Sequence, residues 1–330
     1  MANILRYAGF IKESEYGVRA AGDPFHVDIA SATLDTPSDT NLIYGGGLGK
    51  SARTYRPGYY APAGNVVYAF DVETIGFILK CALGGYQFTA GTGTDLNEHI
   101  IWANENITLP SFACDLGKDV FEHRFMGCVV SSLEISASNE FCQATVGIQA
   151  QKDAKATLLT AADLSLPDAY PLAFHEMTAK IATEDASAKI KDLTLSIDNG
   201  VSADKGRTLG SRYPRRMPGY ERTVTYTLNM LFDDLTELER FWGGASGPAL
   251  KGSTETPLEI LLDGGDYGSL SMFMPKTVYT GVQQQPSGRD EIVQVINGRA
   301  FIGEAPLGAP VDCTETELYC VLENNEETLA

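Results

Sequence analysis

Apolar and polar residues alternate over much of the chain, and this period of two is typical of strands that bury one face. The alternation is clearest in residues 64–70 of the first half and residues 224–230 of the second half. The apolar positions of these two segments are Val66, Tyr68, Phe70, Val224, Tyr226, Leu228 and Met230. We therefore predict a protein made mainly of β-strands with one face in a hydrophobic core.

A helical period of apolar residues follows each of these two strands. The first helix is expected within residues 72–83, and the second begins near Asp234. The apolar faces consist of Ile75, Ile78, Leu79 and Ala82 in the first helix and of Leu235, Leu238 and Trp242 in the second. Asp234 and Glu237 predict a capping box, while Gly84 and Gly243 predict the C-terminal ends.

The strand and the helix belong to a longer segment that occurs twice, about 158 residues apart. Residues 53–85 read RTYRPGYYAPAGNVVYAFDVETIGFILKCALGG, and residues 211–244 read SRYPRRMPGYERTVTYTLNMLFDDLTELERFWGG. Each copy contains an Arg- and Pro-rich loop with the sequence PGY, then the strand, the helix and paired glycines. This common order indicates a duplicated module.

The flanks predict the same order in both copies: a strand, a long loop, a strand, the helix and further hairpin strands. In the first copy the opening strand is expected at 25–34, the loop at 35–63 and the second strand at 64–70. Later strands are expected at 105–116, 120–136 and 140–150. In the second copy the opening strand is marked by Leu193, Leu195 and Ile197, the loop covers 199–221, and later strands are expected at 257–263, 268–280 and 290–302.

These patterns predict two tandem β modules of the sandwich or half-barrel type, each with a short flanking α-helix and a long loop. The expected division is an N-terminal arm (1–24), the first module (25–150), a connector (151–170), the second module (171–303) and an acidic C-terminal tail (304–330). The tail contains no Lys or Arg, and we expect a surface strand followed by a disordered end.

Composition and charge exclude several classes of protein. The 330 residues carry a net charge of -18, which disfavours binding to nucleic-acid phosphates because such binding depends on Lys and Arg. We find no apolar run long enough to span a bilayer and no secretory signal at the N-terminus, so we expect neither secretion nor a membrane anchor. The six cysteines are scattered without CxxC pairs, which fits a reducing cytoplasm and argues against a zinc site.

Candidate catalytic and cofactor motifs are incomplete. Tyr44–Ser51 reads YGGGLGKS, which misses a phosphate-binding loop by one residue and precedes prolines instead of a helix. We interpret it as a flexible loop. No GxSxG or HExxH motif occurs, and the four histidines lie far apart. The adjacent Asp233 and Asp234 are explained by capping. We expect no catalytic residue, no cofactor and no metal.

Two loops are basic and aromatic in this acidic chain, and we interpret them as contacts with other copies of the same chain, since Arg and aromatic residues are enriched in interfaces. The candidate residues are Lys50, Arg53, Tyr55, Arg56, Tyr59 and Tyr60 in the first loop and Lys205, Arg207, Arg212, Tyr213, Arg215, Arg216 and Arg222 in the second. A basic loop that binds an acidic surface elsewhere on an identical chain makes a heterologous contact. Such contacts propagate into rings or filaments.

The chain resembles the tail tube proteins of long-tailed bacteriophages. The resemblance covers most of the sequence and lies in YAGFIKESEYG (7–17), the RPG loop before a strand and helix in the first half, FMGCVVSSLEIS (125–136), LTLSIDNG (193–200), LGSRYPRRMPGYERTVTYTLNMLFDD (209–234) and GRDEIVQVINGRAFIG (288–303). It implies modules whose inner sheets join those of neighbouring modules into one β-barrel around a channel. Usual tail tubes stack hexameric rings, so two modules per chain predict a trimeric ring with pseudo-sixfold symmetry.

The resemblance also implies the function and the partners. Rings would stack through the long loops into a hollow tail that delivers DNA without binding it, and an acidic lumen would repel phosphates. Candidate lumen residues are Glu134, Gln143, Thr225, Thr227 and Asn229. Expected partners are the chain itself, the tape measure protein in the lumen, and the tail terminator and baseplate or tip proteins. The expected location is the virion tail, after assembly in the host cytoplasm.

Two other functions remain open at this stage. A head-decoration, neck or baseplate protein of a virion could use similar β modules without polymerising. A carbohydrate-binding β-sandwich would need exposed aromatic residues on a concave face. Electron microscopy of the purified protein separates the first from a tube subunit, and a glycan array tests the second.

Overall fold

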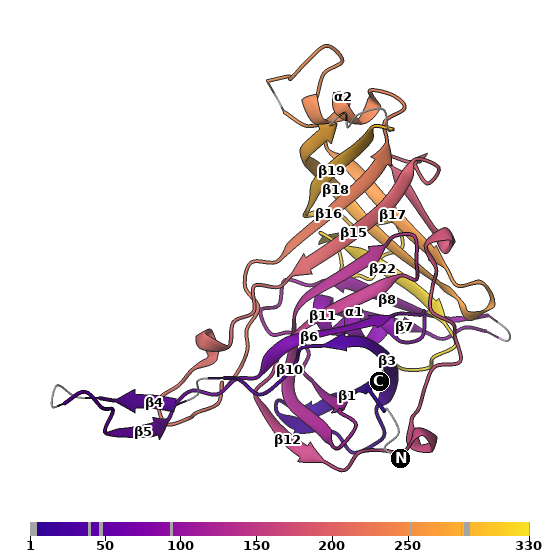
Figure 1. Cartoon of the computed structure of the whole chain (residues 1–330). Helices are drawn as coiled ribbons and strands as arrows, with labels where there is room; N and C mark the ends of the chain where they lie inside the picture. Colours follow the sequence, from indigo (N-terminus) through magenta and orange to yellow (C-terminus); the bar gives the residue numbers. More distant parts are fainter. Residues whose placement is uncertain are drawn as a thin grey trace.

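The computed structural model describes residues 5–38, 41–45, 49–92, 95–250, 252–284, 286 and 291–329. The chain is mainly antiparallel β-structure, with the first-half strands at the base of Figure 1 and the second-half strands above them. The hairpin of β4 (Asn41–Tyr44) and β5 (Thr54–Pro57) projects sideways from the base (Figure 1). The expected mainly β fold is confirmed.

Five first-half strands form the order β3–β6–β11–β10–β9, in which all neighbours are antiparallel. Their bounds are β3 (Phe25–Ala32), β6 (Ala63–Ala69), β9 (Phe112–Gly117), β10 (Glu122–Ala137) and β11 (Gln143–Gln149). Strand β1 (Tyr7–Glu15) pairs with both β9 and β3 and closes the circuit. The segment expected to be an N-terminal arm thus supplies a core strand, in which Ala8 and Phe10 are fully buried.

The second half repeats this pairing as β15–β16–β19–β18–β17. The bounds are β15 (Ile190–Asp198), β16 (Thr223–Leu231), β17 (Thr256–Asp263), β18 (Ser269–Gln284) and β19 (Val293–Phe301). Strand β13 (Met177–Ile181) pairs with β17 as β1 pairs with β9. The long strands β10 and β18 also share a bulge, at Ser131 and Thr280. The pairing order therefore repeats even where the sequences differ.

The two halves share one sheet because β10 pairs with β15. Residues 132–137 of β10 lie opposite residues 198–193 of β15 in an unbroken antiparallel register. The same strand β10 contacts β9 and β12 (Lys152–Ala156) with its first part, so it bends from one sheet into the other. The result is a continuous sheet β3–β6–β11–β10–β15–β16–β19–β18, which is visible as the tall stack of strands in Figure 1.

One face of this sheet forms the hydrophobic core, as the alternation predicts. The alternating positions of β6 and β16 are at most 2% exposed, and Leu193, Leu195 and Ile197 of β15 are equally buried. Burying this many large side chains supplies most of the stabilisation of such a fold, at about 25 cal/mol per Å² of apolar surface. The strand predictions for residues 64–70 and 224–230 are confirmed.

The first helix, α1 (Ile75–Leu83), lies inside the core. The helix expected within residues 72–83 and the burial of its apolar face are confirmed, but all its residues except Lys80 are buried, so it does not have the exposed polar face of an amphipathic helix. Asp71 accepts hydrogen bonds from the Glu73 and Thr74 amides, and Gly84 ends the helix with a left-handed φ of 83°. The helix therefore fills the space between the sheets.

The second helix, α2 (Thr236–Trp242), is peripheral and has no buried residue. Asp234 accepts a hydrogen bond from the Thr236 amide, but Glu237 bonds to Arg240 and Tyr279, so the expected capping box is not formed. Gly243 ends the helix as predicted, with a φ of 67°. This helix lacks the strand cover of α1, because the chain after it forms a loop instead of a hairpin (Figure 1).

Several short elements lie outside the expected pattern. After α1 the chain forms the hairpin β7 (Gly84–Thr89) and β8 (Asn97–Ala103), and the strand expected at 105–116 begins only at Phe112. The expected connector starts with β12, which pairs with β10. The remaining short elements are β2 (Val18–Arg19), β14 (Glu184–Asp185) and the 3-10 turns Ala161–Asp163, Phe174–Glu176, Ala203–Gly206 and Gly265–Tyr267.

The C-terminal segment is not a surface tail, and that prediction is wrong. Strand β22 (Tyr319–Asn324) lies between β18 of the second half and β8 of the first half, with Cys320 and Leu322 fully buried. Even Leu329 is 4% exposed and packs beside α1. Before β22 the chain forms the small hairpin β20 (Gly303–Glu304) and β21 (Glu315–Thr316). The apolar alternation within β22 outweighs the acidic composition around it.

Candidate assembly surfaces and channel face

The β4–β5 hairpin is the most exposed part of the first basic loop. Leu42, Ile43, Tyr44 and Tyr55 are 63–74% exposed, and the exposed Lys50 and Arg56 accompany them. Register pairs Ile43 with Tyr55 and Leu42 with Arg56, so both faces of the ribbon carry apolar side chains. An isolated two-stranded ribbon is marginally stable in water. These side chains are therefore available for contacts with another molecule.

The phosphate-loop-like segment lies at the tip of this hairpin. Residues 46–48 are outside the described part; β4 ends at Tyr44, and β5 begins at Thr54. A phosphate-binding loop aims its amides with a following helix, whereas here a strand follows. The interpretation of Tyr44–Ser51 as a loop without a nucleotide site stays a prediction, because residues 46–48 lie outside the described residues.

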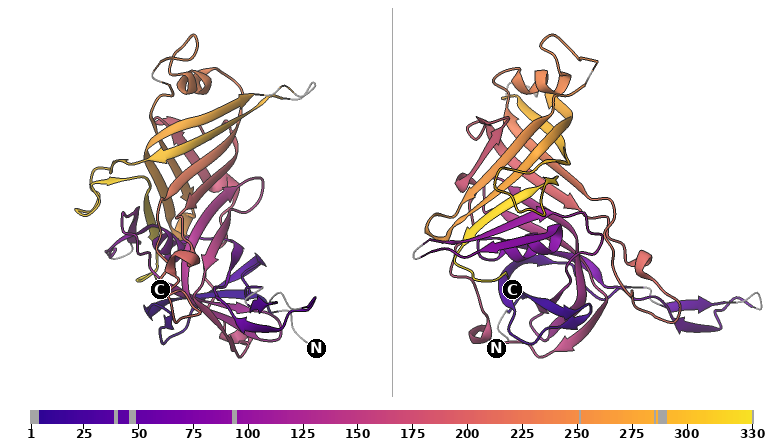
Figure 2. Two further views of the ribbon diagram at one scale, coloured as in Figure 1. Left: turned by 90° about the vertical axis from the view of Figure 1, so that its left-hand side faces the viewer. Right: turned by 180° about the vertical axis from the view of Figure 1, so that it is seen from behind.

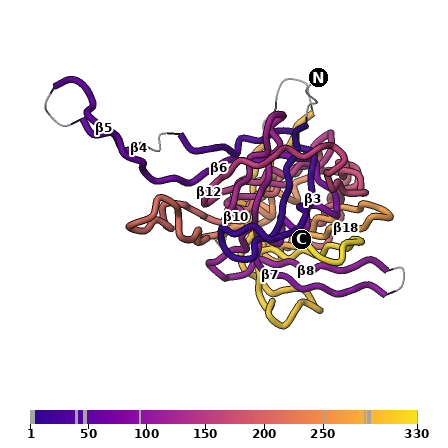
Figure 3. Tube along the Cα trace, turned by 90° about the horizontal axis from the view of Figure 1, so that it is seen from below, coloured from indigo at the N-terminus to yellow at the C-terminus, as the bar shows by residue number. Residues whose placement is uncertain are grey.

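The second basic loop, residues 199–221, lies on the first half of the same chain. The Gly219 amide donates to the Ile107 carbonyl at 2.8 Å, and the Gln151 side chain donates to the Pro214 carbonyl at 2.9 Å. Arg207 and Arg212 stack over Tyr59 and Tyr60 at 5.4 and 5.6 Å from the ring centres. Figure 3 shows this loop and the β4–β5 hairpin leaving the body on the same side.

Several expected contact residues are thus engaged within the chain. Tyr213 packs edge-on against Tyr60 at 5.8 Å, and Arg222 pairs with Glu317 at 3.2 Å while donating to the Asn104 carbonyl. Arg215 is exposed, as is Arg216. Contacts of the predicted residues with other chains remain a prediction. The β4–β5 hairpin projects farther from the body than loop 199–221 (Figure 3), and its segment contains Lys50, Arg53, Tyr55 and Arg56.

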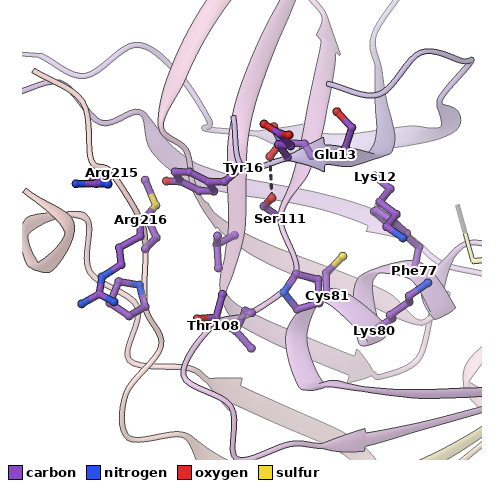
Figure 4. A pocket seen from close by; sticks show the side chains of 17 residues that line it. Lys12, Glu13, Tyr16, Phe77, Lys80, Cys81, Thr108, Ser111, Arg215 and Arg216 are labelled. Atoms are coloured by element: carbon purple, nitrogen blue, oxygen red, sulfur yellow. Dashed lines mark hydrogen bonds between the residues drawn. The ribbon is translucent and has the colours of Figure 1, made fainter. Parts of the chain in front are cut away.

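A cavity of about 380 Å³ lies where loop 199–221 meets β1 and α1 (Figure 4). Glu13 on its wall accepts bonds from Ser111 and from the Gly17 and Gly127 amides, so this carboxylate is fully used in holding the backbone. Burial raises the pKa of Cys81 to about 12, which keeps its thiol protonated and unreactive at neutral pH. Both groups therefore have structural roles where the loop joins the first half.

The polar face of the continuous sheet carries all five residues expected to line a channel. Cross-strand registers put Glu134 beside Ser196, which pairs with Thr225 in β16. Gln143 pairs with Ser136, which pairs with Thr194 and through it with Thr227. Asn229 follows two residues later, opposite Asp192. Paired residues share a face, so these side chains form one surface opposite the core.

Short uncharged side chains dominate this polar face. Ser132, Ser136, Thr145, Thr194 and Ser196 separate the charged positions. Among the paired residues of the continuous sheet, the charged ones on this face are Glu134, Asp192, Asp198, Lys276 and Arg299. The carboxylate excess is small, so most of the acidity of the chain lies on other surfaces.

The sheet ends in two strand edges without a partner strand in the described part of the chain. Residues 281–284 of β18 pair with β19 along one edge, and residues 29–32 of β3 pair with β6 along one edge. A hollow of about 560 Å³ borders residues 29–32. Open edges of this kind are templates for pairing with another chain. Sequence reasoning missed both edges, because open edges follow from pairing over long distances.

Within the described residues, no group of three or more His, Cys, Asp or Glu side chains is placed to hold a metal ion. All six cysteines are free and buried, where a thiol packs as a small apolar side chain. None of the helices in the described ranges has the length and apolar content to cross a membrane.

The repeated β units, the sheet that runs across both of them and its two open edges define a structural protein that assembles with copies of itself. Residues 5–300 match the family model of the phage tail tube protein, and the chain belongs to this family. None of the curated proteins compared with the chain matches it. The chain is therefore a structural component of a phage tail tube, which places it in the virion tail.

Proposed function

We propose that this chain is the major tail tube subunit of a long-tailed phage and that three chains close one ring. The two halves act as two modules, so that the ring has six modules around its channel and pseudo-sixfold symmetry. The β10–β15 junction carries this proposal, because it is a complete interface between modules inside one chain.

Repeating this junction uses both open edges. The bulges at Ser131 and Thr280 align Ser132–Ile135 of β10 with Gly281–Gln284 of β18. Tyr226 and Tyr68 are equivalent positions of the repeat. Tyr226 pairs with Leu195 of β15 and Tyr68 pairs with Ile29 of β3, so Leu195 and Ile29 align these two strands. Residues 281–284 of one chain would therefore pair with residues 29–32 of the next. Each such contact is heterologous, and a rotation that closes it yields a ring.

The polar face of the closed sheet would line the channel. Its Ser, Thr, Asn and Gln side chains hydrate well and are uncharged, and the cations Arg299 and Lys276 are outnumbered by carboxylates, so the face offers passing DNA little cationic surface. Glu134, Asp192 and Asp198 add weak repulsion of phosphates. DNA delivery in this picture depends on a smooth polar wall. The tape measure protein would occupy the same channel during assembly, and terminator and baseplate proteins would close the ends.

The exposed hairpin and loop would join the subunits and the rings. Both loops leave the body on one side of the chain (Figure 3), at the end of the sheet where β3 and β15 lead into them. The apolar side chains of β4 and β5 would be covered by the neighbouring copy. Covering two-sided apolar ribbons favours long stacks over free rings.

A disulfide cross-link tests the ring directly. Ser31 and Gln283 are both exposed, and the repeated junction puts them opposite each other, in the places of Ser196 and Glu134. The double variant Ser31→Cys with Gln283→Cys is oxidised and run on a non-reducing gel. We expect bands of two and three chains and no larger product. The buried native cysteines give little background.

The single variants are the matched controls, because each has one of the two thiols and should stay a monomer on the gel. Negative-stain microscopy of the same samples reports whether rings or tubes are present. Cross-linked products that continue beyond three chains would contradict the trimeric ring. Tubes without any cross-link would contradict the β18–β3 contact.

A further inference from the structure

The second half has an exposed projection that the family match, which ends at residue 300, does not cover. Residues 302–317 leave β19, form the β20–β21 hairpin and lead into β22; we call them the C-terminal projection. In the left view of Figure 2 this yellow segment extends from the body on a different side from the indigo β4–β5 hairpin. One chain thus presents two separate protruding surfaces.

The C-terminal projection is anchored and not a loose loop. Cys313 is 3% exposed and packs in a cluster with Trp102 and Tyr319. The Ala305 amide donates to the Thr314 carbonyl at 3.0 Å, across the base of the projection. Despite this anchoring, Leu307 and Val311 are 106% and 94% exposed. A rigid segment that displays large apolar side chains is typical of a binding surface.

The charge of the C-terminal projection is entirely negative. It contains Glu304, Asp312, Glu315 and Glu317 and no Lys or Arg. Glu304 lies directly opposite Glu315 in the β20–β21 pair, and like charges in that position are unfavourable. Glu317 has an ion pair, with Arg222, whereas the other three carboxylates form none with the described residues. A basic partner would relieve this repulsion.

The β4–β5 hairpin has the complementary chemistry. Residues 41–57 contain Lys50, Arg53 and Arg56 and no acidic residue, beside four exposed apolar side chains. An acidic apolar surface and a basic apolar ribbon satisfy each other in both charge and hydrophobicity. The two surfaces leave one chain on different sides (Figure 2), so the hairpin of one copy would meet the projection of another copy.

The internal repeat brings these two surfaces together. Within the chain, loop 199–221 of the second half reaches back to the first half and contacts Gln151, at the junction of β11 and β12. Strand β22 pairs with the first residues of β18 as β12 pairs with the first residues of β10. The junction of β19 and β22 is therefore the equivalent place in the second half, and the C-terminal projection occupies it.

We propose that the C-terminal projection of one chain binds the β4–β5 hairpin of the next chain in the ring. Residues 33–62 connect β3 to β6 as loop 199–221 connects the equivalent strands β15 and β16. If the junction between modules repeats between chains, residues 33–62 lie on the second half of the preceding chain. This inference rests on the proposed ring. It assigns residues 302–317 a part in assembly in addition to their part in the fold.

A cross-link between the two segments tests the inference. Ile43→Cys combined with Val311→Cys puts one thiol on each surface, and a short bis-maleimide joins thiols that come close. We expect covalent products of two and three chains from assembled protein. The matched control combines Ile43→Cys with Leu166→Cys, which is 55% exposed in the segment between the two halves, and should give no such product.

Charge exchange gives a second measurement that does not depend on thiol geometry. Lys50→Glu with Arg56→Glu, and separately Asp312→Lys with Glu315→Lys, should each slow tube formation about tenfold in low salt, and the combined variant should recover most of the rate. Rescue supports the contact. Rings that form normally with no cross-link and no rescue overturn it while leaving the proposed function intact. If the unaltered chain forms no rings, both proposals fail.

Discussion

Leu322 provides a sharp test of the part that the C-terminal strand plays in the fold. Its side chain is fully buried, and it packs so closely on α1 that a Cβ added at Gly76 would lie 2.4 Å from it. Leu322→Ala leaves a cavity between α1 and the sheet, and such substitutions cost about 2–5 kcal/mol. We therefore expect the variant to lose about 3 kcal/mol of its free energy of unfolding.

The corresponding change in melting temperature follows from the size of the chain. An unfolding entropy of about 2.1 cal/mol/K per residue gives about 0.7 kcal/mol/K for this protein, so a loss of 3 kcal/mol lowers Tm by about 4 °C. Differential scanning calorimetry of unassembled protein measures this shift. Leu307→Ala is the matched control on the same segment, because Leu307 is fully exposed, and its Tm should change by less than about 1 °C. Equal shifts for both variants would refute the reasoning.

Two further predictions concern pH and the channel. Burial raises the pKa of Asp71 to about 6, so the stabilisation linked to its protonation is present below about pH 4 and is lost as pH rises through 6. The free energy of unfolding of Asp71→Asn should therefore rise relative to that of the unaltered chain as pH increases from 4 to 7, by on the order of 3 kcal/mol. Urea unfolding measures this difference, and a difference that stays constant with pH would contradict the prediction. In particles built with Glu134→Lys, DNA release should be several-fold slower than with Glu134→Gln at low salt, and the difference should shrink as salt rises. Equal release rates for the two Glu134 variants at all salt concentrations would contradict repulsion of DNA by the channel wall.

Local patterns in the sequence determined the strands, their buried faces and the repeat. The alternation at Val66, Tyr68 and Phe70 and at its second-half counterpart predicted the buried face correctly, because neighbours two residues apart share a side of any strand. The same rule put Thr225, Thr227 and Asn229 on the opposite face. Glycines 84 and 243 were readable as helix ends, since few other residues adopt a left-handed φ.

Only the tertiary structure decided how these elements combine. Composition marked residues 304–330 as an acidic tail, yet β22 lies between strands of both halves, because its partners β8 and β18 are far away in sequence and cover its apolar residues. Similarly, Arg207 and Arg212 read as contacts with another chain, but folding stacks them on Tyr59 and Tyr60 of their own chain. The open edges of β3 and β18 exist only once every other strand is paired. Long-range pairing therefore decides which surfaces remain for assembly, and short-range patterns do not contain that information.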